Sequence, residues 1–215
     1  MTHRGLAVRR ILSVITVTVV VVALTPPVRT PVLKLIGHAL VIDEPISQAD
    51  VVVVPEWTQA AGVLEAADLV RQGHARAIAI LLGEVEPAER ELIRRGLASP
   101  QRTSWLVSLA RNLEVQVVEA VDGGNGTEAE SRMLPDWCRE RGFRTVIVVS
   151  LPDHSRRLRR LLNRSMADHP TRAIVRTTRY ASYDPDSWWT TRGGVRIQLQ
   201  EGQKLLLDFL QHPFP

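Results

Sequence analysis

Short runs of valine, isoleucine, leucine and alanine recur along this chain of 215 residues, and most are followed by a segment with helical periodicity. A run that is apolar on both faces is typical of a strand buried inside a parallel sheet. Because strands and helices alternate with short connections, the sequence predicts an α/β fold, a three-layer sandwich around a mostly parallel sheet. The predicted strands are Asp50–Val54, Ala77–Leu82, Val115–Val118, Thr145–Ser150 and Ala173–Thr178.

The segments between and after these strands carry apolar residues at helical spacing, often with a capping or stop residue at one end. We expect them to cover both faces of the sheet, within one α/β domain that spans residues 49–215. The predicted helices are Thr58–Gln72, Glu86–Leu97, Gln101–Asn112, Thr127–Arg141, Asp153–Arg164 and Ile197–Gln211.

The N-terminal segment combines positive charge with an apolar run. Arg4, Arg9 and Arg10 precede the run Ile11–Leu24, which ends before two prolines. The strictly apolar part is short of the roughly 20 residues that span a bilayer, but the segment is long enough when it is counted from Leu6. A cleaved signal peptide is one alternative, although no small-x-small cleavage site is clear. A buried core strand or helix is another, which the neighbouring arginines disfavour.

We therefore expect one N-terminal transmembrane helix within an uncleaved anchor over residues 1–27, and a juxtamembrane linker over residues 28–48. The positive-inside rule predicts a single-pass plasma-membrane protein with a cytoplasmic N-terminus and an extracytoplasmic domain. Arg29 and Lys34 lie on the other flank and reduce the difference in charge on which this prediction depends.

Composition excludes some classes of function. The formal net charge of +4 comes with no lysine-rich tail and no basic stripe interleaved with aromatics, so we expect no nucleic-acid partner. Cys138 is the single cysteine and cannot form an internal disulfide. No Cys/His spacing typical of zinc is present, so we expect no metal site, while the identity of any cofactor stays unknown from the sequence.

Ligands of open parallel sheets bind beyond the carboxyl ends of the strands, so the residues that follow each strand are the first candidates for a site. Glu56 follows the first strand and is a candidate acid/base. A Gly-rich loop precedes the helix at Thr127, where backbone N–H groups could hold an anion. Thr127 and Glu130 also have the spacing of a capping box, which needs no ligand, and the two interpretations are compatible. The candidate ligand-binding residues here are Gly124, Asn125, Gly126, Thr127 and Glu130.

The strand Thr145–Ser150 leads into a second helix start. Ser150 ends the strand and is a candidate ligand contact, and Asp153 is the expected N-cap of the helix. His154 and Arg157 share a stripe with two leucines that must face the sheet, so we expect both near the strand ends. His154 is a candidate acid/base and Arg157 a candidate partner for phosphate or carboxylate. The other arginines of this helix, namely Arg156, Arg159, Arg160 and Arg164, are expected to form a solvated face.

Several of these motifs together resemble the DUF218 family, the YdcF/SanA/ElyC-like proteins of bacteria, over residues 42–210. The matching motifs are Ala66-Ala67-x-Leu69 with Gly73, Gly-Thr-x-x-Glu at Gly126–Glu130, Ser150-x-x-x-His154-x-x-Arg157, the Trp188-Trp189 pair and Glu201-x-x-Lys204. The resemblance implies a Rossmann-like fold. It also implies an N-terminal membrane anchor and a role in envelope integrity or in peptidoglycan and lipid-carrier metabolism. One cytoplasmic member of the family is associated with S-adenosylmethionine.

The chain departs from the family pattern in the first half of the expected site. Pro55, Glu56 and Trp57 stand where the family has a Gly-Gly loop, Gly62 occupies the position expected for an arginine, and Ala129 that of an acidic residue. A phosphate-accepting loop has thus lost its most permissive backbone residues, which puts catalysis in more doubt than the fold.

Three functions are compatible with these features. The first is an anchored extracytoplasmic transferase, hydrolase or binding protein for a phosphorylated or otherwise anionic envelope precursor, which can be a small molecule or lipid-linked. The second is a non-catalytic envelope factor that binds a partner. The third is a nucleotide- or S-adenosylmethionine-binding protein, which requires a cytoplasmic domain. On sequence alone, Glu201 and Lys204 read by default as a structural ion pair.

Overall fold

The computed structural model describes residues 10–11, 13–18, 20–21, 25–83, 85–97, 105–124 and 126–214. A five-stranded sheet lies at its centre, and every pair of neighbouring strands is parallel. The strand order is β3-β2-β1-β4-β5, which is the order of a Rossmann-like fold. The strands are β1 (Val51–Pro55), β2 (Ile78–Leu82), β3 (Val117–Asp122), β4 (Thr145–Ser150) and β5 (Arg172–Thr177).

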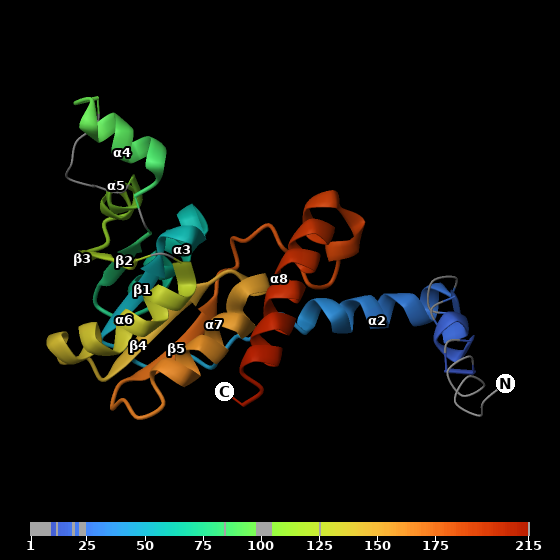
Figure 1. Ribbon diagram of the computed structural model, residues 1–215. Helices are drawn as coiled ribbons and strands as arrows, with labels where there is room; N and C mark the ends of the chain where they lie inside the picture. Colours follow the sequence, from blue (N-terminus) through green and yellow to red (C-terminus); the bar gives the residue numbers. More distant parts are fainter. Residues whose placement is uncertain are drawn as a thin grey trace.

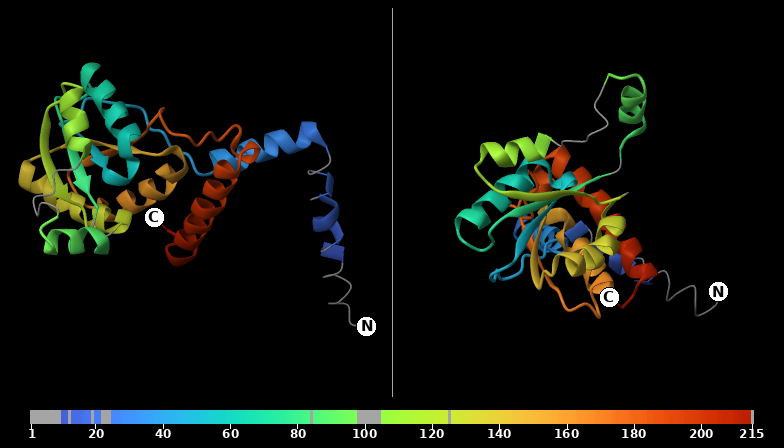
Figure 2. Two further views of the ribbon diagram at one scale, coloured as in Figure 1. Left: turned by 90° about the horizontal axis from the view of Figure 1, so that it is seen from above. Right: turned by 90° about the vertical axis from the view of Figure 1, so that its left-hand side faces the viewer.

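Helices cover both faces of the sheet and make the three layers that the sequence predicts (Figures 1 and 2). Successive residues of a strand point to opposite faces, so Val52 and Val54 join one core while Val51 and Val53 join the other. The first core includes side chains of α3 (Gln59–Arg71) and α5 (Trp105–Asn112), and the second those of α6 (Gly126–Arg141) and α7 (Pro152–Ser165). The expected α/β architecture with a parallel sheet is confirmed.

Strand β3 differs from the sequence prediction, which ended it at Val118. The strand begins at Val117 and continues to Asp122, pairing with β2 as far as Leu82. It lies at the edge of the sheet, and its residues alternate between partly buried and exposed. A search for wholly apolar runs stops at Glu119, although an edge strand with one wet face needs only every second residue to be apolar.

Other helices of the described chain lie at the periphery of this core or connect its elements. Helix α4 (Pro87–Arg94) buries none of its side chains and stands away from the sheet in Figure 1. Helix α8 (Arg192–Gln211) packs along α7 and follows the short 3-10 helix η2 (Trp188–Thr190). A second 3-10 helix, η1 (Glu56–Thr58), connects β1 to α3.

Much of the expected juxtamembrane linker has regular structure or contacts the domain. Helix α2 (Pro26–His38) extends away from the sheet, and its C-terminal end lies against α8 and η2 (Figure 1). Beyond it the chain runs along β5, where the backbone N–H of Glu44 donates to the carbonyl of Val175. Within the described part of the chain, no helix combines the length and apolar character needed to cross a membrane. Part of the predicted span, including residues 1–9, lies outside the described residues.

The sheet topology fixes where a ligand site is expected. The chain passes from β1 to β2 and β3 on one side, and β4 and β5 pair on the other side of β1. The connections that follow β1 and β4 therefore lead to opposite faces of the sheet, and they leave a crevice beyond the carboxyl ends of these two strands. The segments that follow these two strands are η1 and α7, which carry Glu56 and His154.

Candidate functional site

Two adjoining cavities lie beyond the carboxyl ends of the strands, and Trp57 and Gly126 line both of them. The His154 cavity has a volume of about 320 Å³. The Glu56 cavity has a volume of about 410 Å³. The His154 cavity is also lined by Thr127, Leu151, Asp153, His154, Arg157, Glu201 and Lys204. The Glu56 cavity is also lined by Glu56, Gln59, Gly83, Glu86, Glu89 and Glu130.

His154 lies between a hydroxyl and a carboxylate. Its Nδ1 is 3.0 Å from Oε2 of Glu201, and its Nε2 is 3.1 Å from Oγ1 of Thr127. An ionised carboxylate can only accept a hydrogen bond, so Nδ1 carries the proton and Nε2 accepts from the Thr127 hydroxyl. The arrangement has the order hydroxyl, imidazole, carboxylate, in which a base is oriented by a third group.

The imidazole of His154 is held neutral. Burial lowers its pKa below the usual value, the Arg157 guanidinium lowers it further, and Glu201 opposes both effects. Nη2 of Arg157 is 2.9 Å from Nδ1 and 3.3 Å from Nε2, so it points along neither lone pair of the ring. His154 can therefore accept a proton through Nε2 at neutral pH.

Glu201 is the anionic centre of the His154 cavity. Burial opposes its ionisation, but hydrogen bonds from His154 and Lys204 outweigh this effect and lower its pKa to about 2. Lys204 Nζ is 2.6 Å from Oε1, and Arg157 Nε is 3.3 Å from Oε2. One carboxylate thus organises the base and both cations of the cavity.

Trp57 and Glu130 form the boundary between the two cavities. The Trp57 ring packs against the His154 ring with a centroid distance of 4.4 Å, and its Nε1 donates to Oε2 of Glu130 at 2.8 Å. Burial raises the pKa of Glu130 to about 7, a rise to which Glu56 adds and which the Trp57 hydrogen bond opposes. Glu130 can therefore exchange a proton near neutral pH, beside the base.

The Glu56 cavity is acidic. The Glu56 carboxylate accepts from the backbone N–H of Gly83 at 2.6 Å, which joins the end of β1 to the end of β2. The two predicted acid/base residues, Glu56 and His154, line different cavities that meet at Trp57. No lysine or arginine is among the described lining residues of the Glu56 cavity. An anion is therefore disfavoured on the Glu56 side, whereas the His154 side sets Arg157 and Lys204 against the carboxylates of Glu201 and Asp153.

Only part of the Gly-rich loop lies at the cavities. Gly126 lines both, and Thr127 lines the His154 cavity. Gly124 donates its N–H to the side chain of Asp122 at 2.9 Å, so that donor is committed within the loop. Asn125 lies outside the described residues. The capping-box interpretation is wrong, because Thr127 is the second residue of α6 and both of its expected members, Thr127 and Glu130, bond to site side chains.

Ser150 and Asp153 differ from their expected roles. Ser150 is fully buried, and its hydroxyl donates to the carbonyl of Leu151 at 3.0 Å. It is not among the described residues that line the two cavities. Asp153 does not cap α7, because the helix begins at Pro152 with Leu151 as its N-cap. Proline is common at the first position of a helix, because its fixed φ is already close to the helical value. Burial raises the pKa of Asp153 to about 6 at the wall of the His154 cavity.

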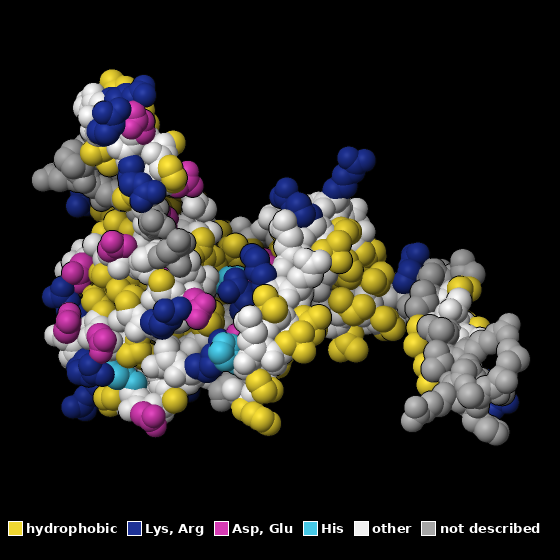
Figure 3. Space-filling view, in the orientation of Figure 1, with side chains coloured by type: hydrophobic (Ala, Val, Ile, Leu, Met, Phe, Trp, Pro, Cys, Tyr) yellow, Lys and Arg dark blue, Asp and Glu magenta, His cyan; other side chains and the backbone are white. Residues whose placement is uncertain are grey.

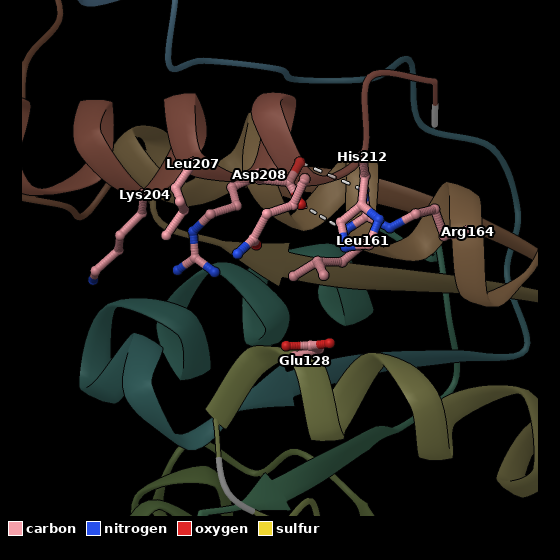
Figure 4. A pocket seen from close by; sticks show the side chains of 9 residues that line it. Glu128, Leu161, Arg164, Lys204, Leu207, Asp208 and His212 are labelled. Atoms are coloured by element: carbon pink, nitrogen blue, oxygen red, sulfur yellow. Dashed lines mark hydrogen bonds and ion pairs between the residues drawn. The ribbon is translucent and has the colours of Figure 1, made fainter.

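The predicted solvated face of α7 is also wrong. Arg160 is buried and pairs with Asp208 of α8. Arg164 donates to the same carboxylate at 2.6 Å, and Figure 4 shows these two side chains. A cavity of about 220 Å³ lies here between α7, α8 and Glu128 of α6. Arg159 pairs with Glu44 at 3.0 Å, and Arg156 donates to backbone carbonyls after α2. Polar side chains on α8 and the segment after α2 meet these arginines, which sequence periodicity does not reveal.

The packing at position 62 accepts no side chain larger than that of glycine. A Cβ at Gly62 would lie 1.9 Å from Oγ1 of Thr58 and 2.6 Å from its Cβ. The Thr58 hydroxyl is itself held by the carbonyl of Pro55, at the end of β1. The local packing around Pro55–Thr58 therefore leaves no room for the arginine expected at this position.

Sequence reasoning missed several residues of the site. Trp57 was noticed only as a residue that follows a strand, and its contacts with His154 and Glu130 give it a positional role. Glu201 and Lys204 carried a sequence signal, their i, i+3 spacing, but that spacing did not indicate that His154 packs against them. Within the described ranges, no three His, Cys, Asp or Glu side chains gather as metal ligands.

The chain matches no protein-family model and no curated protein.

Proposed function

We propose that this chain is a DUF218-like protein of the bacterial cell envelope that binds or processes a phosphorylated or otherwise anionic envelope precursor. The precursor belongs to peptidoglycan or lipid-carrier metabolism. An N-terminal helix anchors the protein in the plasma membrane, with its N-terminus in the cytoplasm and its α/β domain outside. If the protein is an enzyme, it is a transferase or a hydrolase.

The observation that carries this proposal is the contact of His154 with Thr127 on one side and Glu201 on the other. A neutral imidazole that is oriented by a carboxylate and faces a hydroxyl is suited to take up a proton from an attacking group. That group is either the Thr127 hydroxyl or a hydroxyl of the ligand or water that takes its place.

Binding of the anionic part uses the same cavity. The N-terminus of α6 presents Gly126 and Thr127 to it, and helix N-termini favour negative charge. Arg157 and Lys204 line the cavity and would move part of their interaction from Glu201 to a phosphate. Glu130, whose pKa is raised to about 7 by burial, is a candidate second acid/base beside Glu56.

A non-catalytic envelope factor is the second candidate, and the pairing of Arg157 and Lys204 with Glu201 favours it. The carboxylate already compensates the charge that an anionic ligand would need. In this alternative the cleft binds a partner without reaction. A nucleotide- or S-adenosylmethionine-binding protein is the corresponding proposal for a cytoplasmic domain.

Ligand binding tests the proposal directly. We would titrate the full-length protein in detergent with inorganic pyrophosphate and with a polyprenyl phosphate, and compare it with Arg157→Gln. Loss of a charge-assisted hydrogen bond is expected to weaken binding about tenfold or more. Arg172→Gln, which changes an exposed arginine at the start of β5, is the matched control. Equal affinity of all three proteins for both probes would contradict the proposed anion site.

Catalysis is tested separately with His154→Asn in a deletion strain. We expect this variant to bind the probes but not to complement the deletion. His74→Asn, which lies outside both cavities, should complement it. Full rescue by His154→Asn would exclude catalysis by His154 and leave the binding factor. Reporters active on only one side of the membrane, fused after Pro215, test the topology, and a cytoplasmic signal would move the search to nucleotides and S-adenosylmethionine.

A further inference from the structure

The polarity of α8 is reversed relative to that of an ordinary surface helix. Its buried positions are Gly194, Gln198, Glu201, Leu205 and Asp208, so three of the five carry polar or charged side chains. Its exposed positions carry large apolar side chains, although such a helix normally buries its apolar stripe. We call these residues the α8 apolar face: Leu199 (58% exposed), Leu206 (60%), Phe209 (42%) and Leu210 (73%).

The buried side of α8 explains why the reversal is stable. Glu201 meets His154 and Arg157, and Asp208 meets Arg160 and Arg164, so polar contacts with α7 hold the helix. Among the apolar residues of α8, Leu205 is buried with Leu40 and Tyr183, and the Phe209 ring lies against the Arg160 guanidinium, while Leu199, Leu206 and Leu210 are mostly exposed. A face of this kind that lies in water costs free energy, and large exposed apolar patches mark contact surfaces.

Helix α2 adds to the same apolar surface. The side chain of Gln198 donates to the carbonyl of Ile36, and Trp188 donates to that of Leu33, which together fix α2 against α8 and η2. An apolar cavity of about 480 Å³ opens between the two helices, lined by Leu35, His38, Ala39, Arg156, Leu205 and Phe209. Figure 3 shows hydrophobic side chains along α8 and in the direction of α2.

The chain that precedes α2 indicates what kind of partner contacts this apolar surface. Its described residues between 10 and 21 are helical and expose Ile11, Val14, Ile15, Val17, Val20 and Val21. This apolar segment joins the outer end of α2, and the other end of α2 lies against α8 and η2 (Figure 1). Exposed cations accompany them at Arg29 and Lys34 of α2 and at Arg192 and Arg196 of α8. Apolar side chains flanked by cations are typical of helices that lie in the interface of an anionic membrane.

We propose that the α8 apolar face, together with Leu35 of α2, lies in the interfacial region of an anionic bilayer. Helix α8 then runs along the membrane surface, with its opposite side turned to α7 and the His154 cavity. The inference rests on the proposed membrane anchor for bringing α8 to the bilayer, while the reversed polarity of α8 is independent of it.

This orientation also narrows the substrate class. Glu201 and Lys204 reach the His154 cavity from α8 itself, and a helix with its side chains is about 10 Å across. The cavity therefore lies about one helix diameter from the apolar boundary, at the level of lipid head groups. A phosphate carried on a membrane lipid can reach this level without leaving the bilayer.

Site-directed labelling tests the proposal on the full-length protein. A nitroxide is attached to Leu210→Cys, whose side chain is exposed, and in a second protein to Glu140→Cys, an exposed residue at the end of α6. Both are reconstituted into vesicles of phosphatidylcholine and phosphatidylglycerol. The unlabelled chain, in which Cys138 is buried, serves as the blank. Collisions of the nitroxide with oxygen and with a water-soluble nickel chelate report its depth.

We expect the label at Leu210 to favour oxygen over the chelate by several-fold, and the label at Glu140 to favour the chelate. Equal aqueous values at the two positions would overturn the proposal, as would disulfide-linked dimers of Leu210→Cys, which would assign the face to a second copy. A carbonate wash tests the anchor separately. If the wash removes the protein, the anchor is refuted, and the depth measured before the wash still decides whether α8 enters the interface.

Discussion

The substitution Glu130→Gln is expected to stabilise the protein at alkaline pH and to leave its stability unchanged in acid. Glu130 is buried, and its pKa is raised to about 7, chiefly by that burial. A carboxyl group whose pKa is higher in the folded state binds its proton more tightly there than in the unfolded chain. Folding stability therefore falls as the pH rises from about 4.5 to 7, and the whole loss is present above pH 7.

The size of the effect follows from the two pKa values. A difference of about 2.5 units at about 1.4 kcal/mol per unit corresponds to about 3 kcal/mol of unfavourable free energy at pH 8. Glutamine removes the charge, and its side-chain oxygen can still accept the hydrogen bond from Nε1 of Trp57. For a chain of this length, about 3 kcal/mol corresponds to a rise in Tm of roughly 6–12 °C.

Urea denaturation followed by circular dichroism, at pH 4 and at pH 8 in the same detergent, measures the difference. The matched control is Glu128→Gln, which changes a carboxylate in the same helical turn that is 65% exposed and pairs with Arg132 at the surface. Such surface pairs contribute at most about 1 kcal/mol, so the control should follow the unchanged protein. A Glu130→Gln variant that is less stable at pH 8, or equally shifted at both pH values, would refute the reasoning.

Three further predictions concern stability and reactivity. Glu201→Gln should lower the free energy of unfolding by about 3 kcal/mol at pH 7, because the pKa of Glu201 is about 2 in the folded protein. Urea denaturation should show this difference shrinking as the pH falls from about 4.5 to 2. A difference that stays constant with pH would show that the charge of Glu201 is not its cause. Gly62→Ala should lower the free energy of unfolding by about 1–3 kcal/mol, because the new Cβ clashes with Thr58. Gly202→Ala, whose Cβ meets nothing within 4 Å, should not lower it. Equal denaturation midpoints of the two variants would contradict this. Cys138 is buried and its pKa is raised to about 12 by that burial, so it should react with a thiol reagent only in denaturant, and rapid labelling of the native protein would show that α6 is packed differently.

The sheet could be predicted from sequence wherever its strands are buried on both faces. Strands β1 and β2 are buried at every residue, and β4 at all but its first, so their apolar runs carry the signal. The edge strand β3 alternates instead, and its prediction was cut short at Val118. Helix α2 contains Pro31 and was assigned to a linker, yet hydrogen bonds from Trp188 and Gln198 hold it in place. Contacts between segments so distant in the sequence leave no local pattern.

The candidate site divides in the same way. The stripe that joins His154 to Arg157 placed both residues correctly near the strand ends, because helical periodicity is local. The partners of His154 could not be ranked from sequence. Glu201 is 47 residues away, and its spacing to Lys204 has the same appearance as any surface ion pair. The same reason applies to Arg160 and Arg164 of α7, since the Asp208 carboxylate that pairs with them lies on α8.

The origin of Glu201 has a consequence for biosynthesis. The sheet is complete once β5 has been made, up to Thr177, but α8 begins only at Arg192. A nascent chain can therefore build its core while His154 and Arg157 still lack their carboxylate. The imidazole of His154 is oriented by Glu201 only after α8 docks, so a partly made chain would be folded at its centre while its candidate site is still incomplete.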